Sequence, residues 1–355
     1  MFKYLRWLLL PFSWLYVLVT TIRNWCYDAG LFKSQAFDIP VISVGNLDVG
    51  GAGKSPMTEY LIRLLKGEHK LATLSRGYGR KTQGYLIATA TTTATELGDE
   101  PAQFKHKFPD VTVAVCEKRV TGIENLKVDH DLIILDDAYQ HRAVKPGLSI
   151  LLFDYNRVSE PHFLLPAGNL REPFNGRKRA DVIVVTKCPV DLNNQQQQKI
   201  TSRIKPFPGQ QLFFASIVYG TLQNLQGQAS NVNIDTDTTV FLISGIANPT
   251  PLVNELKTRA KQVIHHKYPD HHPYTLKNIT KLADEFNACA VQKKLIITTE
   301  KDAQRLGEQA LYNTVNQLNI LVLPIQIAFL DNAAQKFDQI IKDYVREHTT
   351  HNQLH

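Results

Sequence analysis

One segment constrains the fold of this chain more than any other: a short apolar run, Val41–Val44, leads into a glycine-rich stretch and then into a helical pattern. The core of the stretch, DVGGAGKS at residues 48–55, differs by one residue from the GxxxxGK(S/T) pattern of phosphate-binding loops. Asp48 stands where the first glycine of that pattern belongs. After Pro56, apolar residues recur at the spacing of one buried helix face. Strand, loop and helix in this order predict a P-loop in a parallel sheet.

The composition of this loop fits the binding of a nucleoside triphosphate with a magnesium ion. Its glycines allow backbone N–H groups to converge on phosphate oxygens at the start of the helix. Lys54 is expected to reach the β- and γ-phosphates, and Ser55 is expected to ligate Mg²⁺. The residues predicted to hold the nucleotide are Asp48, Val49, Gly50, Gly51, Ala52, Gly53, Lys54 and Ser55.

A partner for the magnesium ion follows a second apolar run, Leu132–Leu135. This run ends in Asp136 and Asp137, whose carboxylates are the hard oxygen ligands that Mg²⁺ takes. Because acidic residues often follow strands, the motif is informative chiefly together with the upstream loop. The sequence therefore predicts Ser55, Asp136 and Asp137 as metal ligands.

Short apolar runs alternate with helical patterns along most of the chain, which is typical of a parallel sheet covered by helices on both faces. The predicted fold class is α/β: a P-loop NTPase-like parallel sheet, a second, smaller α/β lobe and an N-terminal membrane-anchor helix. The predicted domains are the anchor helix at 1–33, the P-loop lobe at 34–217, the second lobe at 218–330 with linker strands at its ends, and a C-terminal helix with a polar tail at 331–355. The last helix is expected over Asn332–Tyr344.

The N-terminal region carries no charge between Arg6 and Arg23. As a helix, Trp7–Ile22 would be about 24 Å long, which is short against a hydrocarbon core of about 30 Å. Tryptophan and tyrosine side chains of the kind found at headgroup level lie along it. We interpret this segment as a retained membrane anchor, embedded or shallowly spanning. The alternatives are a helix packed on the protein's own surface and a cleaved signal peptide, although no small-residue cleavage site follows.

Charge and cysteine content narrow the classes of function. The 355 residues carry a net charge of +7, which indicates an anionic partner: a nucleotide, a nucleic acid or an acidic membrane surface. The four cysteines show no CxxC spacing, which excludes a zinc ribbon and a disulfide-rich secreted scaffold. No signature of a nucleic-acid-binding module occurs, so no nucleic-acid partner is expected.

Seven motifs occur in order between about residues 40 and 303: SVGNLDVGGAGKSP, LSRGYGRK, GDEP, LDDAYQHR, LLPAGNLREP, PDHH and TTEKDA. With this set the chain closely resembles the tetraacyldisaccharide 4′-kinase family, the lipid A pathway kinases of Gram-negative bacteria. It departs from the usual family pattern at Ser55, where Thr is common, and at Ala138, Tyr139 and Asn169. These departures leave the reactive groups in place.

The resemblance implies ATP- and Mg²⁺-dependent phosphorylation of the 4′-hydroxyl of a tetraacylated glucosamine disaccharide 1-phosphate, giving lipid IVA. It maps a hydroxyl-activating pair onto Asp99 and His271, so that the predicted catalytic residues are Asp99, His271 and Lys54. It also implies two lobes joined by a two-stranded linker, for which Leu212–Tyr219 and Leu321–Phe329 are suitable. The expected partners are the acylated disaccharide lipid and the cytoplasmic surface of the inner membrane, with no obligate protein partner.

Basic and polar residues near these motifs are candidates for binding the acceptor. Arg76 and Arg80 are suited to stabilising phosphoryl charge or the acceptor's 1-phosphate, and a solvated basic loop is an equally good interpretation. Arg171 is interpreted as part of an acceptor-binding or membrane-surface patch. Gln140 and His141 are expected to line the cleft, with structural roles left open.

Two other functions compete with a sugar-lipid kinase. The first is a P-loop GTPase or ATPase switch of the metallochaperone type, but Pro189 stands where a guanine-specific Asp belongs in Val185–Pro189, and the chain has no Cys/His metal cluster. The second is a nucleic-acid-binding ATPase, for which the mild basicity is the only argument. Thr299 and Asp302 of TTEKDA predict a helix cap, and a catalytic role for this segment is left open.

Overall fold

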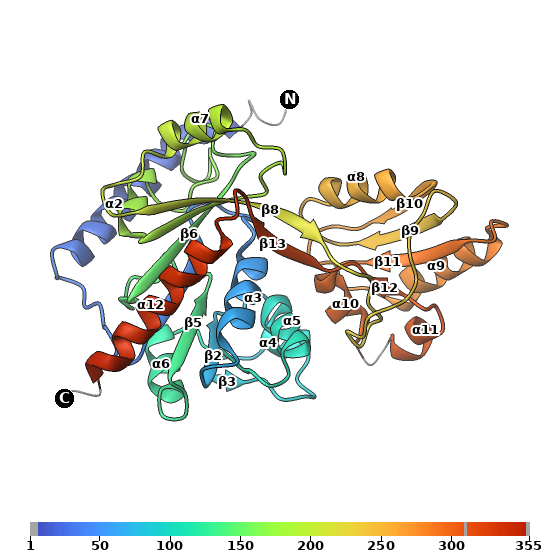
Figure 1. Cartoon of the computed structure of the whole chain (residues 1–355), viewed down its shortest axis with the longest axis horizontal. Helices are drawn as coiled ribbons and strands as arrows, with labels where there is room; N and C mark the ends of the chain where they lie inside the picture. Colours follow the sequence, from blue (N-terminus) through green and yellow to red (C-terminus); the bar gives the residue numbers. More distant parts are fainter. Residues whose placement is uncertain (1–5, 309–310, 353–355) are drawn as a thin grey trace.

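The structure is a computed structural model that describes residues 6–308 and 311–352, and its two lobes lie on the left and right of Figure 1. The first lobe is built on a nine-stranded sheet with the order β13-β8-β7-β6-β1-β5-β2-β4-β3. The second is built on a four-stranded sheet with the order β10-β9-β11-β12. The predicted α/β class with a large, mostly parallel sheet is therefore confirmed.

In the large sheet, neighbouring strands pair in parallel except at its two edges, where β3 pairs with β4 and β13 pairs with β8 in antiparallel fashion. Its central strands are buried along their whole length, because helices cover both faces of the sheet. The strands are β1 (Val41–Asn46), β2 (Leu71–Ser75), β3 (Leu86–Ile87), β4 (Thr112–Val115), β5 (Leu132–Asp136), β6 (Leu148–Asp154), β7 (Val182–Thr186), β8 (Gln211–Tyr219) and β13 (Ile325–Phe329). The helical segments of this lobe are η1 (Arg6–Leu9), α2 (Leu10–Asp28), α3 (Lys54–Leu65), α4 (Ala94–Leu97), α5 (Asp99–Lys107), α6 (Arg119–Leu126), η2 (Phe174–Arg179), α7 (Asn194–Ile204) and α12 (Ala334–Asn352).

The second lobe repeats the same principle on a smaller scale. Its four strands are all parallel, and its core is formed by apolar residues such as Phe241, Ile243 and Ile296. The strands are β9 (Thr239–Ser244), β10 (Gln262–Lys267), β11 (Lys294–Thr298) and β12 (Leu321–Val322). The helices are α8 (Thr250–Arg259), α9 (Leu276–Ala288), α10 (Glu300–Leu306) and α11 (Tyr312–Asn316).

The antiparallel pair β8 and β13 runs between the lobes (Figure 1). The family resemblance implies a two-stranded linker, for which Leu321–Phe329 is suitable as one strand, but in the structure this stretch is split. Leu321–Val322 belongs to the small sheet as β12, and only Ile325–Phe329 pairs with β8. Pro324 lies between the two strands and cannot donate a ladder hydrogen bond, which explains the break.

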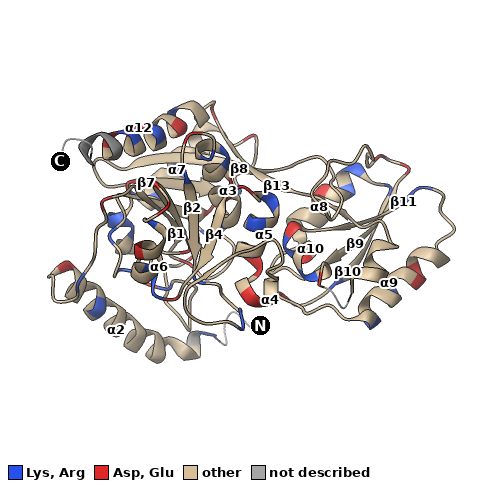
Figure 2. Ribbon diagram, turned by 90° about the horizontal axis from the view of Figure 1, so that it is seen from below, with Lys and Arg blue, Asp and Glu red and all other residues tan. Residues whose placement is uncertain are grey.

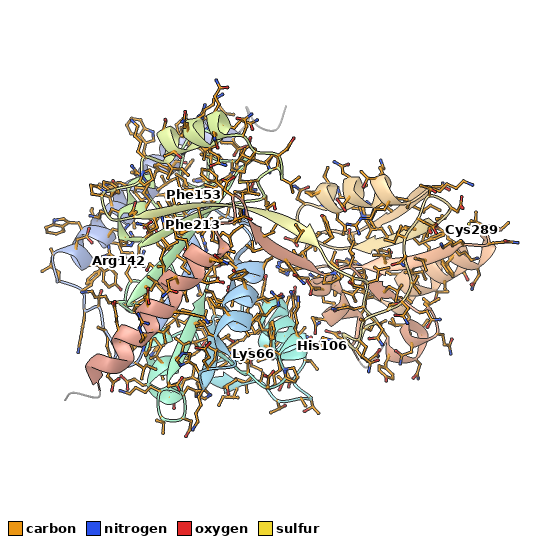
Figure 3. The ribbon with its side chains drawn as sticks, viewed as in Figure 1. Lys66, His106, Arg142, Phe153, Phe213 and Cys289 are labelled. Atoms are coloured by element: carbon orange, nitrogen blue, oxygen red, sulfur yellow. The ribbon has the colours of Figure 1, made fainter. Side chains whose placement is uncertain are left out.

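The C-terminal helix α12 returns from the second lobe and packs on the large sheet (Figure 1). The sequence predicts that this helix ends near Tyr344 and that a polar tail follows, whereas the helix continues to Asn352. Val345 is buried, and the Tyr344 hydroxyl accepts from Val41 N at 3.0 Å, so both residues hold the helix beyond the expected end. The ring centroid of Phe337 lies 5.5 Å from that of Phe213, a residue of β8 labelled in Figure 3. This contact joins α12 to the linker. Residues 353–355 of the expected tail lie outside the described residues.

The helix α2 lies along one side of the first lobe and carries few charges (Figure 2). Its polar side chains face the protein: Ser13 Oγ donates to Leu164 O at 3.0 Å, and Tyr16 OH donates to Arg171 O at 3.0 Å. Its large apolar side chains face outward, with Trp14 exposed by 76% and Leu18 by 56%. Arg142, labelled in Figure 3, holds its C-terminal end by donating to Asn24 O at 3.1 Å.

The expected N-terminal membrane-anchor helix is not supported by this arrangement. Within residues 6–308 and 311–352, no helix is both long enough and apolar enough to cross a membrane. The physical reason is that α2 has two different faces. Polar residues on the face that packs on the first lobe lower the mean hydropathy of the whole helix. Residues 1–5 of the predicted anchor lie outside the described residues.

Candidate active site

The predicted P-loop connects β1 to α3 at the centre of the large sheet. Gly53 precedes α3 with a left-handed φ of 81°, a conformation that favours glycine. Neighbouring side chains bind the carbonyl oxygens of the loop: Arg157 Nη1 donates to Val49 O at 2.6 Å, and Thr186 Oγ1 donates to Ala52 O at 2.8 Å. The first N–H groups of α3 have no acceptor within the helix, so they are available to phosphate oxygens.

Asp48, which replaces the first glycine of the motif, lies before the N–H groups at the start of α3 that are available to phosphate oxygens. It forms an isolated antiparallel bridge with Leu170, and Val49 N donates to Asn169 O at 2.8 Å. Burial raises the pKa of the Asp48 carboxyl, although the nearby Arg157 acts in the opposite direction. The residue therefore fixes the entry of the loop to the LLPAGNLREP segment.

The loop lysine lies beside the predicted acidic pair. Lys54 Nζ is 3.2 Å from Asn46 Oδ1 and 3.6 Å from Asp137 Oδ2. Arg171 binds the same carboxylate with both terminal nitrogens, at 2.8 Å and 3.3 Å. Burial opposes ionisation of Asp137, but Lys54 and Arg171 outweigh it and hold the pKa of this carboxyl below its ordinary value.

Asp136 is buried, and its Oδ1 accepts a hydrogen bond from Thr58 Oγ1 at 3.0 Å. Burial, together with the negative charges of Asp137 and Glu100, raises the pKa of Asp136 to about 6. A cation beside Asp136 would stabilise its ionised form. The described part of the chain holds no group of three or more His, Cys, Asp or Glu residues suited to a metal. An ion here would complete its shell with phosphate and water oxygens, as Mg²⁺ does, so Ser55 and the acidic pair fit that ion.

The predicted pair of Asp99 and His271 is assembled across the two lobes, from positions 172 residues apart in the sequence. Asp99 is the first residue of α5, and His271 follows β10 with a left-handed φ of 57°. His271 Nδ1 donates to Asp99 Oδ2 at 2.7 Å, and Arg305 Nε donates to the same oxygen at 3.1 Å. Gly98 is required before Asp99, because a Cβ at its φ of 92° would lie 2.8 Å from Tyr78 O.

The two members of this pair influence one another electrostatically. The hydrogen bond to Asp99 raises the pKa of His271 above its ordinary value. Burial opposes ionisation of Asp99, but His271 and Arg305 outweigh it and keep the pKa of Asp99 below its ordinary value. The pair therefore combines an ionised carboxylate with an imidazole that titrates higher than usual.

Further contacts hold α5 against α10 at the same place. Lys301 donates to Glu100, and Lys107 lies between Glu59 of α3 and Glu300 of α10. Thr95 Oγ1 donates to Glu308 at 2.9 Å. His106, labelled in Figure 3, extends from α5 toward the second lobe. Glu100 also raises the pKa of Asp136 through its negative charge, which links this contact between α5 and α10 electrostatically to the acidic pair.

The predicted acceptor-binding residues occupy different environments. Gln140 donates to Asn46 O at 2.8 Å and Arg171 binds Asp137, so both lie at the end of β1 beside the P-loop. Arg80 is turned into its own loop, where it donates to Glu117 and to Gly84 O. Arg76 is exposed.

His141 lies near several arginines. Its burial, with the charges of Arg119, Arg23 and Arg76, lowers its pKa to about 4. The same arginines make the surroundings of His141 positively charged. The structure thus brings His141 and Arg76 into one basic neighbourhood.

Four residues of the site were not predicted from the sequence: Asn46, Arg119, Glu172 and Arg305. Asn46 ends the strand before the loop, and Glu172 follows Arg171, so both adjoin predicted residues and a motif-based search would find them. Glu172 is buried and accepts from Arg179 at 2.8 Å and from Gln140 at 3.1 Å. Arg119 is buried near the acidic pair, and neither it nor Arg305 lies in a recognisable pattern.

Two features that the sequence left open have structural roles. Thr299 caps α10 by accepting from Asp302 N at 3.1 Å, so the predicted helix cap is confirmed. His272 stacks on Tyr268 with ring centroids 4.6 Å apart, and its Nε2 is 3.1 Å from Asn278 Oδ1.

A P-loop together with an acid–imidazole pair assembled between two lobes defines a P-loop kinase. The family model that describes tetraacyldisaccharide-1-P 4′-kinases matches residues 5–346, and the chain belongs to this family. The family and the kinase class expected from the motifs are thereby confirmed.

Individual relatives agree with this assignment. A protein named tetraacyldisaccharide 4′-kinase from Bacteroides thetaiotaomicron is 45% identical over 359 residues, with 97% of this chain and 94% of the relative covered. A protein of the same name from Flavobacterium psychrophilum is 44% identical over 353 residues, with 98% and 99% covered. The crystal structure of LpxK from Aquifex aeolicus in complex with ATP superposes with a TM-score of 0.74 at 30% identity, covering 96% of this chain and 99% of that one. These relatives do not favour the alternative of a metallochaperone-type switch.

Proposed function

We propose that this chain transfers the γ-phosphate of ATP to the 4′-hydroxyl of a tetraacylated glucosamine disaccharide 1-phosphate, giving lipid IVA. The observation that carries the proposal is the hydrogen bond between Asp99 and His271, which joins a proton-accepting pair from both lobes. A switch that hydrolyses nucleotide needs no such pair across a lobe boundary. In a kinase the acceptor hydroxyl loses a proton during transfer, and a pair of this kind is suited to accept it.

The P-loop lobe supplies the nucleotide side of the reaction. Lys54 is the first residue of α3, and its Nζ lies beside Asp137. From this position it neutralises charge on the β- and γ-phosphates. Ser55, Asp136 and Asp137 would hold the magnesium ion, which when bound neutralises phosphate charge and orients the transferring group. Arg171 holds the Asp137 carboxylate with two hydrogen bonds and so fixes its orientation.

The Asp99–His271 pair accepts the proton of the sugar hydroxyl. Asp99 holds the imidazole through Nδ1, which leaves His271 Nε2 as the second nitrogen, 3.8 Å from Asp270. Because the carboxylate comes from the first lobe and the imidazole from the second, the pair is complete only when the lobes are in contact. Proton transfer is then coupled to the contact between the lobes.

The acceptor is anionic, and the basic neighbourhood around His141 supports its binding. Arg76 is exposed, Arg119 is buried, and both act on the pKa of His141. Arginine binds phosphate oxygens with two parallel hydrogen bonds, so this neighbourhood suits the 1-phosphate. Arg80 lies in the same LSRGYGRK loop as Arg76 and holds this loop in place by donating a hydrogen bond to Glu117.

The outward face of α2 supports work at a membrane surface. Trp14, Leu18 and Trp25 are each more than half exposed, while Ser13 and Thr20 face the protein. Soluble surfaces rarely expose apolar side chains in such a continuous row. We therefore propose that α2 lies in the interface of the cytoplasmic leaflet of the inner membrane with this face against the lipid, where the acylated acceptor resides.

A transfer assay tests the proposed reaction. Purified chain, ATP, magnesium and a tetraacyl disaccharide 1-phosphate in mixed micelles are expected to yield a bisphosphorylated lipid, detected by thin-layer chromatography and mass spectrometry. The Lys54→Ala variant is the control for contaminating kinases. Hydrolysis of ATP at a rate independent of the lipid, without a phosphorylated lipid, would refute the proposal.

A further inference from the structure

Arg305, on α10, contributes a third group to the cross-lobe pair. Its side chain is only 6% exposed although it is charged. Its Nε lies 3.1 Å from Asp99 Oδ2, the same oxygen that His271 binds. Its Nη1 donates to Gly245 O and to Asp302 Oδ1, each at 3.1 Å.

Gly245 is the centre of the network that carries the histidine loop. Its carbonyl oxygen accepts from His271 N at 3.1 Å as well as from Arg305. Its N–H donates to both oxygens of Asp302, at 3.1 Å each. A Cβ at this position would lie 3.1 Å from Pro269 O and from Tyr274 OH and 3.2 Å from Arg305 Nη1, so a larger residue would press against Arg305 and its surroundings. Arg305 thus touches both the carboxylate of the pair and the backbone that positions the imidazole.

The partners of Asp302 make this network rigid. Asp302 is fully buried and accepts from Tyr274 OH at 2.9 Å and from the N-cap Thr299. A buried cation with carboxylates on two sides is stabilised by them, and its removal leaves those charges uncompensated. The TTEKDA motif therefore has a purpose beyond capping α10: it fixes the guanidinium that faces Asp99.

We propose that Arg305 is a positioning residue for phosphoryl transfer, which holds the Asp99–His271 pair in the charge state and orientation that accept the sugar proton. This inference rests on the proposed function of the pair. Arg305 reaches Asp99 only from the second lobe, so it acts on the carboxylate only in the closed arrangement.

The direction of its effect follows from electrostatics. Two coupled groups titrate as a unit, and a nearby cation disfavours uptake of a further proton by either member. Removing the charge of Arg305 therefore raises the apparent pKa at which the pair takes up the proton that inactivates it. The other charged groups that face the pair are unchanged by that substitution: Lys301 from α10, Glu100 from α5, Asp270 from the histidine loop, and Asp302 behind Arg305.

The test is the pH dependence of kcat/KM for lipid phosphorylation in full-length variants. Arg305→Gln keeps a hydrogen-bonding side chain without the charge. Its acid limb is expected to move to higher pH by about one unit, so activity at pH values below the limb falls roughly tenfold and recovers in alkaline buffer. Arg305→Met should show the same shift. Arg305→Lys keeps the charge, and its limb should stay within a few tenths of a unit of the parent.

Thr95→Val is the matched control, because it removes the contact with Glu308 between the same two lobes without changing a charge near the pair. It should leave the limb in place. A uniform loss of activity at every pH in Arg305→Gln, or an equal shift in Arg305→Lys, would overturn the role of Arg305. Full activity in Asp99→Asn and His271→Gln would instead refute the proposed pair, so the two failures are distinguishable. If Arg305→Met does not fold, the Gln and Lys variants decide the question.

Discussion

Replacing Asp99 by asparagine removes one negative charge from the centre of the cross-lobe contact and changes the shape of the side chain very little. The Asp99 side chain is only 12% exposed, and its carboxylate accepts hydrogen bonds from His271 at 2.7 Å and from Arg305 at 3.1 Å. Both hydrogen bonds are charge-assisted, a type that contributes about 1.5–3 kcal/mol each. The neutral amide weakens both and no longer increases the basicity of the imidazole.

The expected magnitude follows from these contacts. A positioned general base contributes about 10²–10⁴ in rate, which at about 1.4 kcal/mol per tenfold corresponds to about 3–5 kcal/mol of activation free energy. We expect Asp99→Asn to lower kcat by at least about 100-fold by this estimate. The KM for ATP should stay within about twofold, because the hydrogen bonds that the described residues give the Asp99 carboxylate come from His271 and Arg305, outside the P-loop.

Steady-state lipid phosphorylation at varied ATP and at varied lipid separates these parameters. Asp110→Asn is the matched control. The Asp110 side chain is 59% exposed and forms a surface ion pair with Lys66. Such a pair contributes about 1 kcal/mol or less to stability. It should leave both constants unchanged. A raised KM for ATP with an unchanged kcat in Asp99→Asn would show that the residue binds nucleotide, and the reasoning would be wrong.

Three further perturbations probe the other parts of the structure. Lys54→Ala should abolish lipid phosphorylation while circular dichroism and the thermal midpoint stay close to the parent; residual transfer at the parent rate would contradict its phosphate-binding role. Trp14→Gln combined with Leu18→Gln removes two outward apolar side chains, each of which contributes about 1.5–3 kcal/mol when it is buried in lipid. The vesicle–water partition coefficient, measured by co-sedimentation with anionic vesicles, should therefore fall at least 100-fold. Tyr312→Gln on the second lobe should leave this coefficient unchanged. Equal vesicle binding by all three proteins would exclude the membrane role of α2. Phe337→Ala empties a fully buried position under α12 and should lower the free energy of unfolding in urea by about 3–5 kcal/mol; a loss below about 1 kcal/mol would mean that the helix is not docked as described.

The local parts of the site were predictable because their residues are neighbours in sequence. The stretch from Asp48 to Ser55 specifies its own loop, and Asp136 and Asp137 end a strand that a parallel sheet places next to the P-loop strand. The contact between Asp99 and His271 was not derivable in this way. It joins residues 172 positions apart, and only the family resemblance indicated it.

The failures of prediction have a common physical cause. The uncharged pattern of α2 predicts an anchor, but hydropathy along the chain does not register on which face Ser13 and Thr20 lie, and these residues face the first lobe. Arg305 carries no local signal, because its partner Asp99 comes from the other lobe. A buried arginine acquires its meaning from the fold around it, which sequence periodicity does not describe.

In the proposed reaction, the P-loop of one lobe and the pair shared between both lobes act on one acceptor hydroxyl. The most direct test follows the labelled γ-phosphate of ATP into a tetraacyl disaccharide 1-phosphate and locates it in the product by phosphorus NMR. We expect one label per lipid, attached at the 4′-position, in a reaction that stops when magnesium is chelated. Label released only as inorganic phosphate, or attached elsewhere on the disaccharide, would contradict it.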